Sequence, residues 1–541
     1  MKKIIKNGDS IYLVDEKNNK TYFCELIEIT DRLIDICTRK EYIKCAITKD
    51  GIKKEMSIQS YSILSGNFIK VFASYGLSLI NNQKNSSLLS EYLFDAANRC
   101  KPKLIHSSLG FHDVDGKLYF LADRTYPMTK SVYFKDDTGI SRKGDFATWL
   151  SELTPYLEAR PELQLALAIG ASGTVNAYLK HIGVIDTSFT PLFAFIGRSS
   201  TGKTTALKLA ASLFGKPEYG TGMIYGAFDT DNFVYNTLSG RYGFPYFIDD
   251  TAVVHNKDFS QMIYQLSSGS DKHRLNTDLK ASSAGSWLSS VIFTGESSIF
   301  TQTNSNSGLY ARLIEFECNW TGSAETANAI LSIIALNHGC AWQPFVEALM
   351  KDKDNLKSRY SEYFEQIKTK LPATSNGLTD RITSMLSVVM LSAHILESIC
   401  RFKYNMQSIM EMIINAASNN IAVDPVDDAY EAVLGYIAAN MFDYGFKDKY
   451  FAGDKSKTHV WVASAYFRDL FKKLTGKEFD TMQKEFANRK YIRKFSDGCT
   501  SKHKLNDVIT RCYCINISSF SKQSNSYSIA NEKFGGINDE D

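Results

Sequence analysis

A glycine-rich segment near the middle of the 541-residue chain carries residue types that bind polyphosphates. The apolar run Leu192 to Ile196 is typical of a buried strand, and the sequence from Gly197 to Thr204, GRSSTGKT, fits the pattern G-x-x-x-x-G-K-[ST]. Glycine permits backbone conformations and close approaches that a Cβ would forbid, so successive N–H groups can converge on one phosphate. A helix predicted to follow, up to Phe214, would add the positive end of its dipole. The segment therefore predicts a site for a nucleoside triphosphate.

The expected roles in this site follow from side-chain chemistry. Lys203 would reach the β- and γ-phosphates, and the Thr204 hydroxyl would be a ligand of Mg²⁺. The residues expected to contact the nucleotide are Gly197, Ser199, Ser200, Thr201, Gly202, Lys203, Thr204 and Thr205. The predicted cofactors are accordingly ATP and Mg²⁺, and the alternative is a chance match on a glycine turn.

A second apolar strand, predicted from Gly243, ends in the paired carboxylates Asp249 and Asp250. Asp249 would hold the metal ion, and Asp250 would orient and deprotonate the attacking water. The spacing from Lys203 to Asp249 leaves room for one helix and one further strand. That is the spacing that an α/β fold built on a P-loop needs.

A third strand ends at Thr294 and is followed by a polar tip that contains Glu296. If this strand lies between the two preceding ones, Thr294 or Glu296 would lie beside the γ-phosphate and could sense it. Arg312 follows eighteen residues after Thr294, at the start of another predicted strand. Supplied to a neighbouring subunit, it could act as an arginine finger, because a planar guanidinium suits the charge of a transferring phosphoryl group. The alternative is a surface ion pair with Glu315 or Glu317.

Basic residues gather in two places that could contact a nucleic acid. A hairpin predicted between Ser270 and the strand of Thr294 carries Lys272, His273, Arg274 and Lys280. Residues 447–522 hold 17 Lys and Arg against 8 Asp and Glu, in a chain whose net charge is only +3. Such clusters are typical of phosphate-binding surfaces, although a solvated lysine-rich surface is the alternative.

The basic C-terminal part has the element order of a winged helix. Helices are predicted from Ala463 to Leu474 and from Asp480, as cap, to Asn488; strands at 491–495 and 510–517 would flank a basic loop. The expected DNA contacts are Lys484, Arg489 and Lys490 on the second helix, and Lys502, His503 and Lys504 on the hairpin. A zinc site is the alternative use of Cys499, His503, Cys512 and Cys514, although the set lacks a paired C-x₂₋₄-C knuckle.

Length and composition favour several packed domains, since 44% of the residues are hydrophobic. The absence of an apolar run of eighteen residues and of a signal-like start favours a cytoplasmic protein without membrane contact. Ten cysteines without a CxxC pair suit a reducing compartment. The predicted parts are a β-rich N-terminal domain (1–143), a helical collar (144–182), a P-loop core (183–345), a helical lid (346–445), a winged-helix domain (446–520) and a flexible tail (521–541).

The ordered segments GRSSTGKTT, YFIDD, VIFTGES and GLYARLIEFE resemble the AAA+ ATPases of phage and mobile-element replication helicases. In particular, the chain is similar to the family catalogued as domain of unknown function 927, over roughly residues 20 to 340. With its basic C-terminal part it also resembles the MCM-like, self-loading replicative helicases of staphylococcal cassette chromosomes. Two departures stand out, because Asp250 replaces a more common Glu and Thr294 replaces a more common Asn.

This resemblance implies an α/β AAA+ core within a ring, usually a hexamer, that threads single-stranded DNA while ATP is cleaved between subunits. The implied function is an ATP-dependent DNA helicase that serves replication of a mobile element. The implied partners are single-stranded and forked DNA, further copies of the chain and replication proteins of the same element. Two alternatives remain: a DNA-binding initiator that uses ATP only to assemble, and a defence or signalling ATPase whose N-terminal domain senses a ligand.

Overall fold

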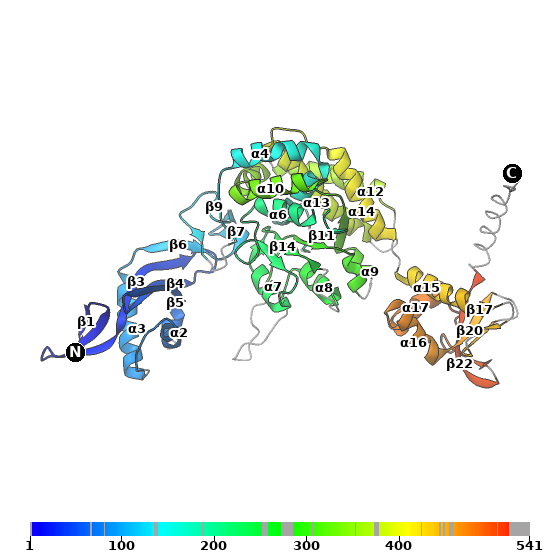
Figure 1. The fold of residues 1–541 in the computed structure, drawn as a ribbon, viewed down its shortest axis with the longest axis horizontal. Coiled ribbons are helices and arrows are strands. Elements are labelled where there is room, and N and C mark those ends of the chain that lie inside the picture. Colours follow the sequence, from blue (N-terminus) through cyan, green and yellow to red (C-terminus); the bar gives the residue numbers. More distant parts are fainter. Residues whose placement is uncertain are drawn as a thin grey trace, which may run out of the picture. The chain divides into compact units, whose positions relative to one another are not determined.

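The computed structural model describes most of the chain, in two compact units (Figure 1). The described residues are 3–64, 68–80, 82–134, 139–186, 189–251, 258–271, 285–303, 307–351, 353–372, 378–422, 425–442, 445–446, 449–453, 458–505 and 507–518. The basic segment predicted as a hairpin, with Lys272, His273, Arg274 and Lys280, lies outside the described residues, as does the tail 521–541. The larger unit contains residues 1–257, 261–299 and 312–417, and the smaller one 258–260, 300–311 and 418–541.

The N-terminal part of the larger unit is β-rich, as predicted. Five strands form an antiparallel meander in sequence order: β1 (Lys3–Asn7), β2 (Ser10–Val14), β3 (Lys20–Asp35), β4 (Glu41–Lys49) and β5 (Ile52–Gln59). β6 (Pro102–His106) adds to β3 in parallel and pairs with β10 (Val132–Tyr133). Helices α1 (Ser60–Leu64), α2 (Phe68–Ser74) and α3 (Gln83–Asn98) supply apolar side chains to the core of this sheet.

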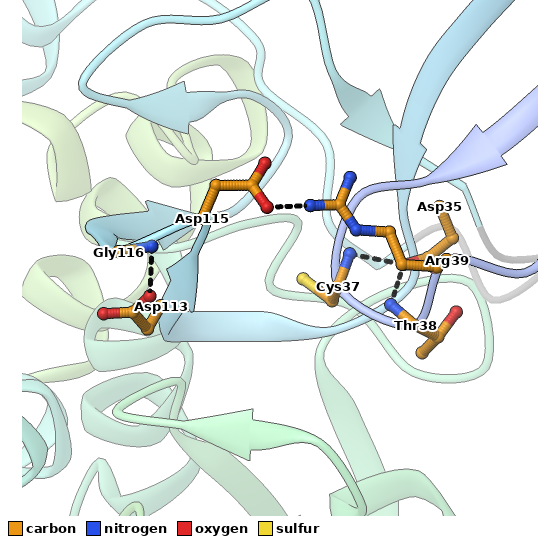
Figure 2. A network of polar contacts seen from close by, with 7 residues as sticks. All are labelled: Asp35, Cys37, Thr38, Arg39, Asp113, Asp115 and Gly116. Atoms are coloured by element: carbon orange, nitrogen blue, oxygen red, sulfur yellow. Dashed lines mark hydrogen bonds and ion pairs between the residues drawn. The ribbon is translucent and has the colours of Figure 1, made fainter.

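A second small sheet, in the order β13-β7-β8-β9, contains β7 (Leu109–Val114), β8 (Lys117–Leu121), β9 (Thr125–Tyr126) and β13 (Arg241–Tyr242). Asp35 accepts hydrogen bonds from two backbone N–H groups in the turn after β3, and Asp113 accepts one from Gly116 in the turn after β7 (Figure 2). Arg39 and Asp115 form an ion pair between these two turns. Because both side chains are exposed, this pair contributes little to stability.

Two helices lead from these sheets to the central one. Asp145 caps α4 (Phe146–Ala159) by accepting from the Thr148 N–H at 3.0 Å, and α5 (Pro161–His181) begins with proline at its first position, where no N–H is needed. Almost every residue of α5 is buried, because it packs against α6 and α13.

The central sheet consists of five parallel strands in the order β12-β14-β15-β11-β16. They are β12 (Ile224–Gly226), β14 (Tyr246–Asp249), β15 (Val291–Gly295), β11 (Leu192–Ile196) and β16 (Leu313–Glu317). The strand that contains Thr294 therefore lies between β11, which precedes the glycine-rich loop, and β14, which ends at Asp249. A role for Thr294 at the γ-phosphate would require this order. The mixed α/β fold class is confirmed.

Helices cover this sheet and continue the larger unit. They are α6 (Lys203–Ser212), α7 (Asp231–Leu238), α8 (Ser260–Ser268), α10 (Ala324–Leu336), α11 (Trp342–Lys351), α12 (Lys353–Lys370) and α13 (Leu378–Ile399). Thr230 caps α7 by accepting from the Phe233 N–H at 3.3 Å. Among the described residues one helix, Thr379–Ile399, is long and apolar enough to cross a membrane, but most of it is buried where α13 packs on α5 and α12.

The smaller unit contains α9 (Ser307–Tyr310), α15 (Pro425–Asn440) and a four-stranded antiparallel sheet in the order β19-β20-β22-β21. The four strands are β19 (Phe451–Gly453), β20 (His459–Ala463), β21 (Ser501–Leu505) and β22 (Val508–Asn516), with helices α16 (Ser464–Thr475) and α17 (Phe479–Asn488) between β20 and β21. A short pair, β17 (Met441–Phe442) and β18 (Gly445–Phe446), follows α15, and α14 (Met406–Ala422) connects the two units.

Two details of this unit differ from the sequence prediction. The first strand of the hairpin is β21, whereas in the segment 491–495 the structure has only isolated bridges at Ile492 and Phe495. Lys502, His503 and Lys504 therefore lie on a strand and not in a loop. Asp480 is not the cap of α17, because the helix already begins at Phe479; its carboxylate instead pairs with Arg468 at 2.8 Å.

Candidate functional site

The loop between β11 and α6 has positive φ angles at three positions, a conformation that favours glycine. Gly197 and Gly202 have φ values of 131° and 84°, and Ser200 has a φ of 68°. A Cβ on Gly202 would lie 2.4 Å from the Thr321 Oγ1, so this position requires glycine for space as well as for conformation. The Trp320 N–H donates to the Thr201 carbonyl at 2.8 Å and fixes the loop from the opposite side.

Lys203 is 9% exposed, and its ammonium group folds back over this loop. Its Nζ donates to the carbonyls of Gly197 at 2.8 Å and Arg198 at 2.7 Å. A buried ammonium has three donors and needs acceptors for all of them, and phosphate oxygens at the start of α6 would be strong ones. The charge therefore lies at the predicted phosphate position.

Asp249 lies at the end of β14 and is 3% exposed. Its Oδ1 accepts from the Thr204 hydroxyl at 3.2 Å and from the Thr294 hydroxyl, and its Oδ2 accepts from the hydroxyl of Tyr219. Burial raises the pKa of the Asp249 carboxyl, whereas the two threonine hydroxyls and Lys208 act to lower that pKa. The carboxylate is thus held by three hydroxyl groups that come from three different parts of the chain.

Thr294 also fixes the backbone beside Asp249. Its Oγ1 accepts from the Asp250 N–H at 2.9 Å, and its carbonyl accepts from the Thr251 hydroxyl at 2.9 Å. Asp250 has a φ of 62°, a left-handed conformation that is uncommon for a residue with a side chain. This turn directs the Asp250 side chain into solvent, where it lines a cavity together with Glu296.

This cavity has a volume of about 460 Å³ at the carboxyl edge of the central sheet. It brings together most of the residues predicted to bind the nucleotide, the paired carboxylates Asp249 and Asp250, and Glu296. The predicted residues that line it are Ser199, Ser200, Gly202, Lys203, Thr204, Thr205, Asp249, Asp250, Thr294 and Glu296. Gly197 and Thr201 shape the loop without lining the cavity.

Sequence reasoning missed the opposite wall. The lining residues that it did not find are Tyr219, Thr321, Ser323, Ala324, Ala327 and Asn328. Ser323 caps α10, so a second helix N-terminus faces the cavity together with that of α6. The capping pattern at Ser323 is visible in the sequence, but nothing in its spacing places it beside Lys203.

The chemistry of this cavity fits a magnesium nucleotide. Two helix N-termini and a buried lysine favour an anion, and a cavity of this size can hold a ligand with several phosphates. The Thr204 hydroxyl and the Asp249 carboxylate are hard oxygen donors that already lie within hydrogen-bond distance of each other. These two side chains would hold Mg²⁺.

Arg312 lies at the opposite edge of the sheet. Its carbonyl accepts from the Leu192 N–H at the start of β11, whereas the glycine-rich loop follows the end of β11. The guanidinium carbon lies 4.6 Å from the centre of the Tyr264 ring. Burial and the nearby Arg381 lower the pKa of Arg312. Of the two acidic residues considered as its partners, Glu315 accepts from the Ile299 N–H at 2.6 Å.

The predicted DNA-contacting residues of the smaller unit have different surroundings. Lys484, Lys490, Lys502 and Lys504 are exposed. Arg489 follows α17 and pairs with Asp427 of α15 at 2.7 Å. The alternative zinc set does not assemble: among the described residues no three His, Cys, Asp or Glu side chains could hold a metal ion, and the His503 ring stacks on Trp461 at 4.2 Å.

Comparison with known proteins identifies a solved structure with a similar fold and the family to which the chain belongs. Over 96% of its length the chain is similar to a solved structure named "SCCmec type IV Cch - active helicase", with a TM-score of 0.69, 20% sequence identity and coverage of 98% of that chain. Residues 5–284 match the family described as Domain of unknown function (DUF927), which covers more than half of the sequence, so the chain belongs to this family. No curated protein matches the sequence. The predicted resemblance to this family is confirmed.

Proposed function

We propose that the protein is an ATP-dependent DNA helicase, a ring-forming AAA+ motor that serves replication of a mobile genetic element. The observation that carries this proposal is the convergence of Lys203, Thr204, Asp249 and Thr294 at one edge of a parallel sheet, with the strand of Thr294 inserted between the other two. The similar solved structure is itself named as an active helicase, which supports the same function. We place the AAA+ core within residues 183–345 and a winged-helix domain within residues 446–520.

The proposed roles follow from the geometry. Lys203 and the N–H groups that begin α6 bind the β- and γ-phosphates, and Thr204 with Asp249 holds Mg²⁺. Magnesium bound there would supply positive charge to the phosphate oxygens. Asp250 is exposed to the same cavity and acts as the base for the attacking water, while Thr294 keeps both acidic residues oriented.

DNA is the proposed partner because exposed lysines gather on the smaller unit, and the segment with Lys272, His273, Arg274 and Lys280 is a further candidate contact. Lysine binds phosphates without reading bases, so the affinity for single-stranded DNA should fall as salt rises. The protein would then track along one strand of any sequence.

The test is unwinding of a forked DNA duplex by the purified chain in the presence of ATP and Mg²⁺. We expect strand separation by the wild-type chain and none by Lys203→Ala, which loses the phosphate contact. ATP-dependent DNA binding without strand separation would overturn the helicase in favour of an initiator. ATP hydrolysis that responds to a ligand other than DNA would favour a signalling ATPase.

A further inference from the structure

The hairpin of β21 and β22 ends in two exposed apolar residues. Val508 and Ile509, the first two residues of β22, are 65% and 69% exposed. Two adjacent apolar side chains at the tip of a hairpin are a candidate contact for a partner. Leu505, which pairs with Val508 across the hairpin, is buried. The exposed apolar side chains of this turn are therefore those of Val508 and Ile509.

Cations share one face of this hairpin with Ile509. The register pairs Lys502 with Arg511 and Lys504 with Ile509. Paired residues point to the same side of a sheet, and so do residues two apart on one strand. Lys502, Lys504, Arg511 and Ile509 therefore form one face, which we name the wing face, and all four are exposed.

The two sides of the hairpin are used differently. On the opposite side, the His503 ring stacks on Trp461 of β20 at 4.2 Å with an angle of 1° between the planes. On the side of the wing face, Tyr513 lies two residues beyond Arg511 and donates its hydroxyl to Gln483 of α17 at 2.9 Å. The wing face thus lies on the side of the sheet that α17 covers, and Lys484 of α17 is also exposed.

We propose that the wing face binds the DNA backbone at a fork and that Val508 and Ile509 form a wedge that separates the first base pair. This inference rests on the proposed helicase function. Cations on the wing face would hold the phosphates of one strand, and an apolar tip can replace the stacking that a base loses when its pair opens. Motion of the duplex against this fixed tip would then separate the strands.

The charges favour DNA over a second protein chain as the occupant. Three cations lie on the same face as Ile509, and Asp507 beside the tip pairs with Lys504 at 2.7 Å. Both members of that pair are exposed, so it is weak and exchanges readily with a phosphate. A contact between subunits would instead be depleted in charged residues near its apolar core.

The test compares the double variant Val508→Ser/Ile509→Ser with the matched control Val508→Ile/Ile509→Leu, which keeps an apolar tip. We expect the serine variant to unwind a forked duplex at least tenfold more slowly and the control to stay within twofold of wild type. A fluorescent adenine analogue at the first base pair should brighten on binding of wild type and control, but not of the serine variant. ATP hydrolysis stimulated by single-stranded DNA should remain unchanged in all three.

The outcomes separate this proposal from the function on which it rests. If the wild-type chain neither unwinds forks nor responds to DNA, the helicase function fails. If wild type and the serine variant unwind equally fast, the wedge is wrong while the helicase stands. If the serine variant changes its sedimentation as an assembly, the tip is a contact between subunits and the wedge is overturned.

Discussion

The Thr294 hydroxyl bonds to both acidic residues of the site, to one as a donor and to the other as an acceptor. It donates to the Asp249 carboxylate and accepts from the Asp250 N–H at 2.9 Å. Thr294→Val keeps the shape of the side chain and removes both bonds. We expect a loss of stability of about 1–3 kcal/mol, because a backbone N–H and a carboxylate lose a partner, and a decrease in kcat of roughly 10²-fold, the size usual for a catalytic-site hydrogen bond.

Thr294→Ser is the control for this prediction, since it keeps the hydroxyl. Its kcat should remain within a few-fold of wild type, and its unfolding should resemble that of wild type. Steady-state ATPase and chemical denaturation measure both quantities. Equal activity of the valine and serine variants would show that the hydroxyl has no role in hydrolysis.

Tyr219 makes a different prediction, because its hydroxyl donates to Oδ2 of the same Asp249 carboxylate that would hold Mg²⁺. The ring lies below the Lys208 ammonium at 5.0 Å, which keeps the phenol in place. Tyr219→Phe should therefore lower the Mg²⁺ concentration for half-maximal ATPase, by up to roughly tenfold for one hydrogen bond to a charged group. The affinity for nucleotide without metal should not change, and an unchanged Mg²⁺ requirement would refute competition for this carboxylate.

The sequence could predict the local part of this site and not its remote wall. Gly197 to Thr204 and the pair Asp249–Asp250 lie next to strands that their own apolar runs reveal. Tyr219, Thr321 and Asn328 reach the cavity from segments with no spacing relation to these motifs. Their positions depend on how the sheet and α10 pack, which periodicity in one segment does not contain.

At the scale of elements, α15 and α17 are joined by an ion pair that changes the expected role of Arg489. Its guanidinium pairs with Asp427 at 2.7 Å, and the Tyr491 ring beside it stacks on Tyr430 at 3.8 Å. Arg489→Ala should lower the melting temperature of the chain, because this contact holds the helices together. Lys484→Ala should instead lower DNA affinity and reduce the salt dependence by about one counterion.

Both variants can be compared by thermal melting and by DNA titration at several salt concentrations. The prediction is wrong if Arg489→Ala melts like wild type while losing the same DNA affinity as Lys484→Ala. In that case Arg489 would exchange Asp427 for a phosphate, which is the DNA contact that the sequence predicts.

The sequence predicts the first strand of the hairpin in segment 491–495, whereas the structure has it at β21. Residues 491–495 contain the aromatic and β-branched side chains that are typical of strands, yet only isolated bridges form there, at Ile492 and Phe495. β21 reads SKHKL and looks like a loop, because its lysines face solvent and His503 packs on an aromatic ring. A strand whose outer face is cationic lacks the apolar alternation by which strands are recognised.

A buried histidine at the end of β6 predicts how stability depends on pH. His106 donates from Nε2 to the Ala122 carbonyl at 2.7 Å and accepts at Nδ1 from the Ser131 hydroxyl at 2.9 Å. Burial lowers the pKa of His106, so the unfolded chain takes up a proton at a higher pH than the folded chain does.

This contribution to stability is complete above about pH 6.5, the unfolded pKa, and falls by up to about 1.4 kcal/mol per unit as the pH drops toward the folded pKa. His106→Gln should reduce the slope of unfolding free energy against pH between about 6.5 and 5. Denaturant titrations over this range measure the slope. An identical slope in both proteins would mean that His106 titrates alike in the folded and unfolded states.

At the scale of the whole molecule, the central sheet separates Arg312 from the nucleotide cavity of its own chain. Arg312 precedes β16 at the amino edge, and the cavity lies at the carboxyl edge, about 16 Å away along five residues of strand. An arginine finger must contact the transferring phosphate. We therefore propose that Arg312 completes the site of an adjacent subunit in the ring.

Composite sites predict that two inactive variants restore each other. Lys203→Ala destroys the cavity of its own subunit but still supplies Arg312, and Arg312→Ala keeps an intact cavity but supplies no finger. In mixed rings, a subunit with Lys203 next to one with Arg312 forms a complete site, so ATPase should rise above both parents. As the control, Lys203→Ala mixed with Asp249→Asn should give no gain, because every cavity is then damaged. No gain at any ratio of the first pair, in rings shown to exchange subunits, would place Arg312 outside the reaction.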